Sequence, residues 1–295
     1  MHVPVLLHGV MEKLNPKAGE FVIDGTLGAG GHAKELIESI KPGGKFLGVD
    51  WDKSSIEIAA KNIDREGLDN CLLHKGNYAA LPEILRDKEL GKADVLLIDL
   101  GFSSDQLDNG RGVSFQKNEP LLMTYSDDAT PAYTVIRQLK KRELAEVIKE
   151  FSDEKYAERI AEAIFERNKK EPIKTTGELA EVIKSAVPEN YERGRINPAT
   201  RTFQAIRKYV NDELGNLETI LQNLKEVIKP GGRVGIISFH SKEDRLVKNY
   251  FRNMADAGDA ELITKKPLQA TEDEAQSNPK SRSAKLRVFE RKKDF

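Results

Sequence analysis

The stretch Phe21-Val-Ile-Asp24-Gly25-Thr-Leu-Gly28-Ala-Gly30-Gly31-His32 decides the fold of this chain. It has the pattern of a short buried strand, a glycine-rich turn and the start of a helix, and a second apolar run further on ends in Asp50. Glycines let a backbone approach a ligand at a helix start, and a carboxylate that closes the next strand can accept hydrogen bonds from ribose hydroxyls. The two features together predict a nucleotide-like cofactor.

Two cofactor classes compete for this turn. Residues 28–33 satisfy the G-x-G-x-x-A pattern of dinucleotide enzymes, and Asp50 follows at the spacing of about 20 residues that the pattern expects. However, three residues separate Asp24 from Gly28, whereas a pyrophosphate turn follows its strand directly. A carboxylate at Asp24 would repel phosphates but attract the ammonium and sulfonium groups of S-adenosylmethionine. The turn therefore favours S-adenosylmethionine, and a bare strand-to-helix turn with glycines for tight packing is the alternative.

The chain around this turn alternates apolar runs with segments of helical periodicity. Four runs have the character of buried parallel strands: 21–24, 45–50, 70–74 and 93–99. This alternation predicts an α/β fold, Rossmann-like, with a mostly parallel, doubly wound sheet. Asp24, Asp50 and Asp99 each close a strand, so we expect the three carboxylates to converge on one crevice beyond the carboxyl edge.

The alternation stops at about residue 107. Apolar residues then recur at helical spacing in three segments: 144–151, 157–164 and 179–186. Strand character returns at 233–240, where residues 229–232 nearly repeat the Lys-Pro-Gly-Gly sequence that ends the first helical segment. We therefore expect a discontinuous sheet domain, 1–107 with 198–295, interrupted by a small all-helical insertion over 108–197.

The C-terminal part of the chain predicts the edge of the sheet. Two further runs, 260–264 and 285–290, are compatible with an antiparallel pair. The polar segment 269–281, which contains Pro and Ser, has the composition of a mobile loop.

Composition restricts the class of protein. The 295 residues are 39% apolar and 32% charged with a net charge of -1, which is ordinary for a soluble protein and gives no global attraction to nucleic acid. The single Cys71 excludes an internal disulfide and fits a reducing cytosol. No apolar run approaches the roughly 18 residues of a membrane span, and the N-terminus lacks a signal peptide. We expect a cytoplasmic protein that contacts no membrane and, since its histidines lack metal-ligand spacing, holds no catalytic metal.

Asp99 lies where methyltransferases that act on exocyclic amino groups place an acidic or amide residue. Such an amino group is a poor nucleophile because its lone pair is shared with the ring, and an oxygen that accepts its N–H bond can aim the lone pair at a methyl carbon. Asp99 is therefore a candidate catalytic residue. It can equally hold the cationic end of the cofactor, and capping the turn that follows is the structural alternative.

Two stretches rich in Lys and Arg, 191–208 and 276–295, are candidates for contacts with RNA phosphates. Arg201 and Arg207 in the first stretch are candidate substrate contacts. His240 ends the resumed strand, where it can contact a base near the cofactor or simply be a satisfied strand-end histidine.

Several whole segments together resemble the bacterial family of 16S ribosomal RNA cytosine-N4 methyltransferases known as RsmH or MraW. The matching segments span nearly the whole chain: 2–7, 23–32, 99–108, 197–207, 237–241 with 243–245, and 281–287. The sequences Ala-Thr-Arg-Thr-Phe-Gln and Ser-Phe-His-Ser, in this order, are the specific part of the resemblance.

The resemblance implies methyl transfer from S-adenosylmethionine to the exocyclic N4 of a cytidine in the decoding centre of 16S rRNA, within the small ribosomal subunit. It places Gly30, Gly31 and His32 at the methionine end of the cofactor, Asp50 at the ribose and Tyr78 beside the adenine. It also places Asp99 and Gln106 nearby. An aromatic residue after the third strand can stack on adenine, and ordinary packing is the alternative for Tyr78.

The chain departs from the family pattern at a few positions. Leu122 and Thr124 replace an acid and a base, and Gly9 replaces a glutamate. Two other functions therefore stay open: a ribosome-assembly factor that binds rRNA but has lost methyl transfer, and a DNA amino-methyltransferase. A nicotinamide oxidoreductase is the least expected.

Overall fold

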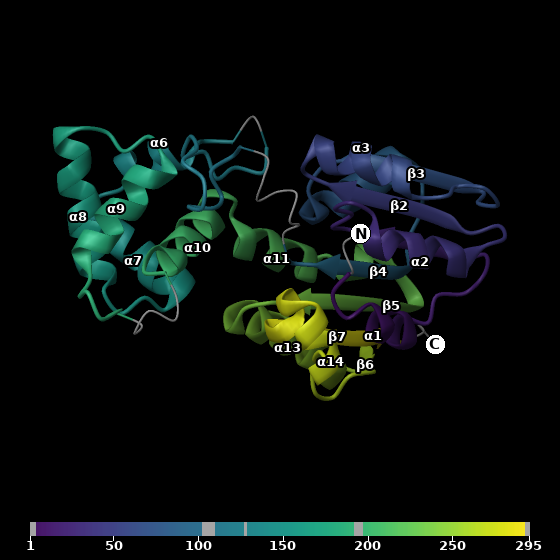
Figure 1. Ribbon diagram of the computed structural model, residues 1–295. Helices are drawn as coiled ribbons and strands as arrows, with labels where there is room; N and C mark the ends of the chain where they lie inside the picture. The colour runs from purple at the N-terminus through teal and green to yellow at the C-terminus, as the bar shows by residue number, and fades with distance from the viewer. Residues whose placement is uncertain (1–3, 102–109, 127–128, 192–196, 293–295) are drawn as a thin grey trace. The chain divides into compact units, whose positions relative to one another are not determined.

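The computed structural model describes residues 4–101, 110–126, 129–191 and 197–292 (Figure 1). The chain forms two compact units: Met1–Gly101 with Leu214–Phe295, and Phe102–Glu213. These borders differ from 107/108 and 197/198, where the sequence analysis places them. The second border shifts because helix α10 (Ala199–Val210) buries Phe203 and Ile206 in the hydrophobic core of the helical unit.

The first unit is built on one seven-stranded sheet. Its strands are β1 (Phe21–Asp24), β2 (Lys45–Asp50), β3 (Asn70–Lys75), β4 (Ala93–Asp99), β5 (Ile228–Ser238), β6 (Ala260–Leu262) and β7 (Lys285–Arg291). Their order is β3-β2-β1-β4-β5-β7-β6; the first five are parallel, and β7 runs antiparallel to β5 and β6. The predicted Rossmann-like α/β class, the mostly parallel sheet and the antiparallel edge are confirmed.

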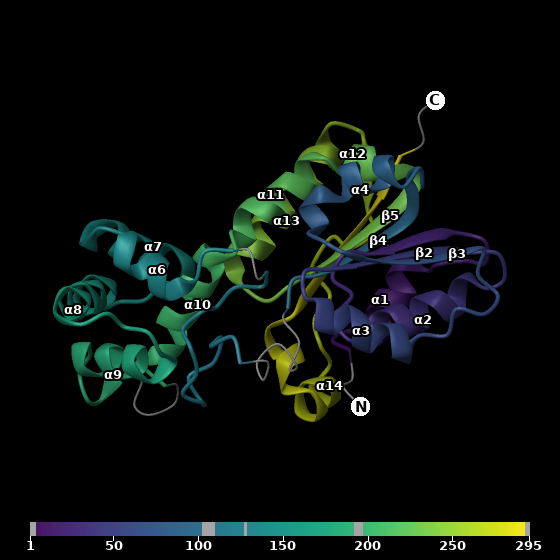
Figure 2. The same ribbon diagram turned by 90° about the horizontal axis from the view of Figure 1, so that it is seen from above.

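Alternating side chains along the strands build two hydrophobic layers. Val22 and Leu97 point into one layer, and their neighbours Ile23 and Leu96 point into the other. Figure 2 shows the helices that cover the first face: α1 (Leu7–Leu14), α2 (Gly31–Ile40) and α3 (Lys53–Asn62). The opposite face carries α4 (Leu81–Asp87), α11 (Glu213–Gln222), α12 (Leu224–Val227) and α13 (Ser241–Asp256). Burial on both faces explains why the central strands are continuously apolar.

Two segments of this unit differ from expectation. β5 begins at Ile228 instead of 233, because Ile228 already pairs with Ala93 before residues 229–232 bulge out and Arg233 resumes pairing with Val95. The polar segment 269–281, expected as a loop, contains helix α14 (Glu272–Ser277) and enters a 3₁₀ helix (Pro279–Ser283). The hydroxyl of Thr271 caps α14 by accepting a hydrogen bond from the Glu274 N–H at 3.2 Å.

The helical unit contains α6 (Ala132–Gln138), α7 (Lys141–Ser152), α8 (Ala157–Lys170), α9 (Thr176–Ala186) and α10. Helices α7, α8 and α9 confirm the three segments expected from periodicity, and their apolar stripes form one core with α10. A capping box starts α9: the Thr175 hydroxyl accepts from the Glu178 N–H at 3.3 Å, and the Glu178 carboxylate accepts from the Thr175 N–H at 3.0 Å.

Candidate functional site

The carboxyl edge of the parallel sheet gathers three acidic residues. Strands β2, β1 and β4 are neighbours in the sheet and end in Asp50, Asp24 and Asp99. Asp24 and Asp50 are buried, and the Asp99 side chain keeps 19% of its surface exposed. The three strand ends that the sequence singled out therefore meet at one edge.

The glycine turn between β1 and α2 needs glycine at two positions for different reasons. Gly30 has φ +85°, and a Cβ there would lie 3.2 Å from Ile63 Cγ2 and 3.3 Å from Ala59 Cβ. Gly31 has an ordinary backbone, but a Cβ would lie 2.8 Å from Pro4 Cγ. Both glycines therefore allow close packing against the protein itself, Gly30 against α3 and Gly31 against Pro4, while a Cβ at Gly28 would have no neighbour nearer than the Thr26 carbonyl at 4.0 Å.

Asp50 fastens this turn to the end of β2. One carboxylate oxygen accepts a hydrogen bond from the Gly28 N–H at 2.8 Å, and the other accepts from the Asp52 N–H at 2.9 Å. Burial raises the pKa of Asp50 to about 6, against the lowering effect of these backbone donors. The Trp51 N–H is a third backbone donor to this carboxylate, which leaves one of its four lone pairs for a ligand hydroxyl.

Asp24 is the most isolated of the three carboxylates. It is 2% exposed, and its side chain accepts one hydrogen bond, from the Thr26 N–H at 3.1 Å. Its pKa is raised to about 7, mainly by burial and also by the nearby charges of Asp99 and Asp50, against the lowering effect of the Thr26 N–H. Within the described ranges, no Lys, Arg or His side chain forms an ion pair with Asp24. A buried carboxylate without a cation is costly, so a cationic ligand fits this position.

His32 lies between the N-terminal segment and Asp99. Its Nε2 donates a hydrogen bond to the Val5 carbonyl at 2.9 Å, and its Nδ1 lies 3.8 Å from Asp99 Oδ2. The other oxygen of Asp99 accepts from the Gly101 N–H at 3.2 Å. Asp99 therefore caps the turn after β4 with one oxygen and faces His32 with the other.

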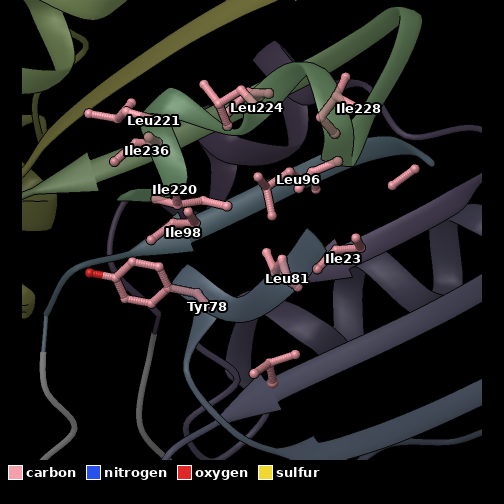
Figure 3. Close-up of a cluster of buried hydrophobic side chains, with 14 of the residues drawn as sticks. Ile23, Tyr78, Leu81, Leu96, Ile98, Ile220, Leu221, Leu224, Ile228 and Ile236 are labelled. Carbon is pink, nitrogen blue, oxygen red and sulfur yellow. The ribbon is translucent and has the colours of Figure 1, made fainter. Parts of the chain in front are cut away.

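Tyr78 lies in a 3₁₀ turn (Tyr78–Ala80) after β3. Its contacts are those of a core residue, the alternative to stacking on adenine. It is 7% exposed and belongs to the hydrophobic layer with Leu81 and Ile98. Figure 3 shows its ring at the border of this cluster, with the hydroxyl directed away from the labelled aliphatic side chains. Gln106, also expected near the cofactor, lies outside the described residues.

Of the three candidate substrate contacts, His240 belongs to the first unit. It is the N-cap residue of α13, is half-buried, and donates its backbone N–H to Glu243 Oε2 at 3.1 Å. The capping box with Glu243 fixes the start of α13 just beyond the end of β5.

The other two candidates, Arg201 and Arg207, belong to the helical unit and are engaged there. Arg201 donates to the Tyr191 hydroxyl at 2.7 Å, and that hydroxyl lies 2.7 Å from both oxygens of the buried Glu154. Arg207 forms an ion pair with Glu213, with Nε 3.0 Å from Oε1. Both cations of this basic stretch thus have acidic or hydroxyl partners within their own unit.

The comparisons with known proteins decide the family. The sequence model of the MraW methylase family matches residues 1–292. The chain belongs to the MraW methylase family. A relative from Syntrophus aciditrophicus (strain SB), named ribosomal RNA small subunit methyltransferase H, is 41% identical and covers 98% of this chain and 97% of its own length. Relatives of the same name from Syntrophotalea carbinolica and Coprothermobacter proteolyticus are each 40% identical and each cover 98% of this chain, with 98% and 96% of their own lengths. The resemblance and the cofactor, S-adenosylmethionine, are confirmed: the protein is an S-adenosylmethionine-dependent methyltransferase.

The structure gives reasons for two departures from the MraW family pattern. A side chain at Gly9 would bring a Cβ within 2.7 Å of Leu268 Cδ2, so α1 packs here because residue 9 has none. Thr124, which replaces a base, is buried at 4% exposure, and Arg111 lies 3.4 Å from its hydroxyl. Nothing in the structure explains Leu122.

The sequence analysis missed several residues that shape this site. Thr26 accepts a hydrogen bond from the Asp99 N–H at 2.6 Å, and Asp52 caps α3 by accepting from the Ser54 N–H at 3.0 Å. The pattern Asp-x-Ser after a strand is an N-cap signal that could have identified Asp52. The Val5 carbonyl, which orients His32, had no local signal, since the contact spans 27 residues.

No described helix is long and apolar enough to cross a membrane. No group of three or more His, Cys, Asp or Glu side chains with metal-binding geometry occurs among the same residues.

Proposed function

We propose that this protein transfers a methyl group from S-adenosylmethionine to the exocyclic N4 of a cytidine in the decoding centre of 16S rRNA, in the small ribosomal subunit. Membership of the MraW methylase family supports the chemistry, and the name shared by the relatives supports the substrate. A cytoplasmic location follows from this substrate. The structural observation that carries the proposal is Asp24, a buried carboxylate without a described cationic partner beside the glycine turn.

The residues at the carboxyl edge fit the methyl donor. S-adenosylmethionine supplies an electrophilic methyl group on a positively charged sulfur. Asp24 offers the negative charge that its ammonium and sulfonium groups require, and Asp50 offers a free lone pair to a ribose hydroxyl. Gly28 leaves room for close approach, Gly30 and Gly31 let the turn pack against α3 and Pro4, and Tyr78 presents an aromatic ring at the border of the core. In this proposal these residues, with Asp99, Gln106 and His32, bind the cofactor.

Asp99 and His32 then orient the reacting amino group. An oxygen of Asp99 can accept an N–H bond of the cytosine amino group, which directs the nitrogen lone pair away from the ring. His32 is held at Nε2 by the Val5 carbonyl, and its Nδ1 lies beside Asp99 Oδ2, where it orients the carboxylate. In this proposal Asp99 is the catalytic residue, and the nitrogen releases its proton to solvent once it is methylated.

The substrate is assigned to residues of both units. His240, Arg201 and Arg207 are proposed to contact the RNA, and the helical unit is proposed to recognise it, while the unit that carries the sheet performs methyl transfer. The target cytidine must leave any base stack it occupies to reach the carboxyl edge.

The test uses the purified full chain, labelled S-adenosylmethionine and small ribosomal subunits that lack this modification. Nucleoside mass spectrometry should detect N4-methylcytidine in 16S rRNA and none in control reactions with large subunits. Cofactor binding without turnover would instead indicate an assembly factor that has lost methyl transfer, and label in DNA would indicate a DNA amino-methyltransferase.

A further inference from the structure

A basic cavity lies in the first unit, on the side of α13 that faces the β6–β7 connection. It has a volume of about 310 Å³, and its lining includes five cationic side chains: Lys248, Arg252, Lys265, Lys266 and Arg287. No carboxylate lines it. Figure 1 shows the elements that contribute, with α13 beside β6 and β7. We call these five residues the α13 basic pocket.

The base of the pocket is rigid. Phe251 of α13, which also lines the pocket, is buried and packs edge-to-face on Phe289 of β7, with ring centroids 4.6 Å apart. Arg287 is 7% exposed, and its Nε lies 2.6 Å from Asp244 Oδ1. Arg287 is therefore held in place by an ion pair.

The other four cations have no such partner. Among the residues that the structure describes, none of the ion pairs or hydrogen bonds involves the side chain of Lys248, Arg252, Lys265 or Lys266. Lys248 and Arg252 are four residues apart on α13, where like charges destabilise a helix by about 0.2–0.5 kcal/mol. The like charges in the pocket repel one another and reduce stability. A bound anion would offset this repulsion, so the pocket fits an anionic ligand.

The pocket has a direct structural connection to the carboxyl edge. Helix α13 starts at that edge, immediately after His240, and Lys248 lies eight residues further along it. At 1.5 Å per residue this places Lys248 about 12 Å along the helix axis from His240. A single polyanionic strand that reaches the carboxyl edge can therefore also pass over the pocket.

We propose that the α13 basic pocket binds the phosphodiester backbone of the rRNA substrate, away from the nucleotide that is methylated. This inference rests on the proposed function for the identity of the RNA. Four cations without protein partners exceed what one small phosphate needs, and they match consecutive phosphates of a strand. An anionic membrane surface fits less well, because Ile263 is the exposed large aliphatic side chain found nearby and an inserting face needs several.

The test compares one quadruple variant and two double variants of the full chain, and the folding of each is checked. The pocket variant is K248Q/R252Q/K265Q/K266Q. A second, smaller pocket variant is K248Q/R252Q. Its matched control is K17Q/K45Q, which neutralises two exposed lysines at the opposite, amino edge of the sheet. All are expected to fold, with urea midpoints equal to that of the wild type or, in the two pocket variants, slightly higher because like charges are removed. Their affinity for S-adenosylmethionine should stay within about twofold of the wild type, since none of these residues belongs to the cofactor site.

The measured quantity is the affinity for small ribosomal subunits over a range of KCl concentrations. Each lost phosphate contact lowers the slope of log K against log salt by about 0.7–0.9. The pocket variant should lose about 2.8–3.6 from the slope and about a thousandfold in affinity at 0.1 M salt, and K248Q/R252Q should lose about half of that slope. The control K17Q/K45Q should match the wild type.

The outcomes separate this inference from the proposed function. A pocket variant with the slope of K17Q/K45Q overturns the inference, even if the wild type methylates 16S rRNA. A loss of slope together with a wild type that transfers no methyl group supports the pocket and overturns the proposed function. Wild-type binding to anionic vesicles or to inorganic phosphate that is lost in the pocket variant, with rRNA binding unchanged, also overturns the inference.

Discussion

At the carboxyl edge of the sheet, Asp24 is buried with one backbone hydrogen bond, whereas in the helical unit the equally buried Arg207 forms an ion pair with Glu213. Burial of a charge costs free energy in both places, but only in the helical unit does an oppositely charged side chain offset that cost. Buried charges without a partner in the protein occur mainly at functional sites, where a ligand supplies the opposite charge. The comparison therefore separates a charge kept for a ligand from one that holds the fold.

The largest expected effect tests the paired side of this comparison. Arg207→Ala leaves the Glu213 carboxylate buried without its cation, so the free energy of unfolding should fall by about 3–5 kcal/mol. Urea titration followed by circular dichroism measures the loss. R207A/E213Q should lose less than R207A, because it removes the unpaired negative charge.

The control for Arg207 lies in the same unit. Arg142 pairs with Glu146 on the surface of α7, with its side chain 90% exposed, so R142A should change the free energy of unfolding by about 0.5 kcal/mol or less. If R207A and R142A lose the same amount, the buried pair is not structural. The proposed contact with RNA would then be the one role left for Arg207.

The second prediction tests the unpaired side. Asp24→Asn should weaken S-adenosylmethionine about tenfold to hundredfold in calorimetry, because a charged hydrogen-bonding partner of the ligand is lost. The same substitution should increase the free energy of unfolding above pH 7 by up to a few kcal/mol, because it removes a buried charge. Asp94→Asn is the matched control: Asp94 pairs with Lys229 and accepts from the Phe21 N–H, so it should lose stability and keep cofactor affinity.

The pH dependence of the wild type follows from the same pKa. The raised pKa of Asp24, about 7, means that the folded chain holds a proton which the unfolded chain releases near pH 4. Its contribution to stability is therefore complete below about pH 4 and is lost as pH rises through about 7. Cofactor affinity has the opposite trend and should rise between about pH 6 and 8, because the ionised carboxylate attracts the cation. A flat profile in D24N and a rising one in the wild type would assign the effect to Asp24.

Local sequence patterns predicted the parts of this protein that depend on neighbouring residues. The four parallel strands before the insertion follow from apolar runs of the right length, and the gathering of Asp24, Asp50 and Asp99 follows from parallel pairing. Helices α7, α8 and α9 follow from a 3.6-residue period. In these cases, the signal and the structure it specifies occupy the same stretch of chain.

Charge pairing was the part that the sequence could not specify. The stretch 191–208 is strongly basic as a sequence, yet Arg201 and Arg207 contact partners through Glu154 and Glu213, which lie outside it. The α13 basic pocket shows the reverse, because Lys248 and Lys265 are distant in sequence and share one cavity. Net charge along the chain therefore does not report which cations are free.

The smallest expected effect separates backbone strain from steric contact at the glycine turn. Gly30 and Gly19 have nearly the same positive φ, +85° and +81°, but a Cβ at Gly19 meets nothing within 4 Å. Both G19A and G30A should lose about 1–2 kcal/mol of unfolding free energy for the left-handed backbone, and G30A about 1 kcal/mol more for its contacts with Ile63 and Ala59.

The affinity for the cofactor is the second measurement on G19A and G30A. Only G30A should weaken S-adenosylmethionine, because only Gly30 lies in the turn proposed to bind the cofactor, and its methyl group would push that turn away from Ile63 and Ala59. Equal losses of stability in G19A and G30A would mean that α3 moves aside to accept the methyl group. Helix packing would then not require glycine at position 30. The affinity of G30A for the cofactor would show whether glycine is required for cofactor binding or only for the left-handed backbone.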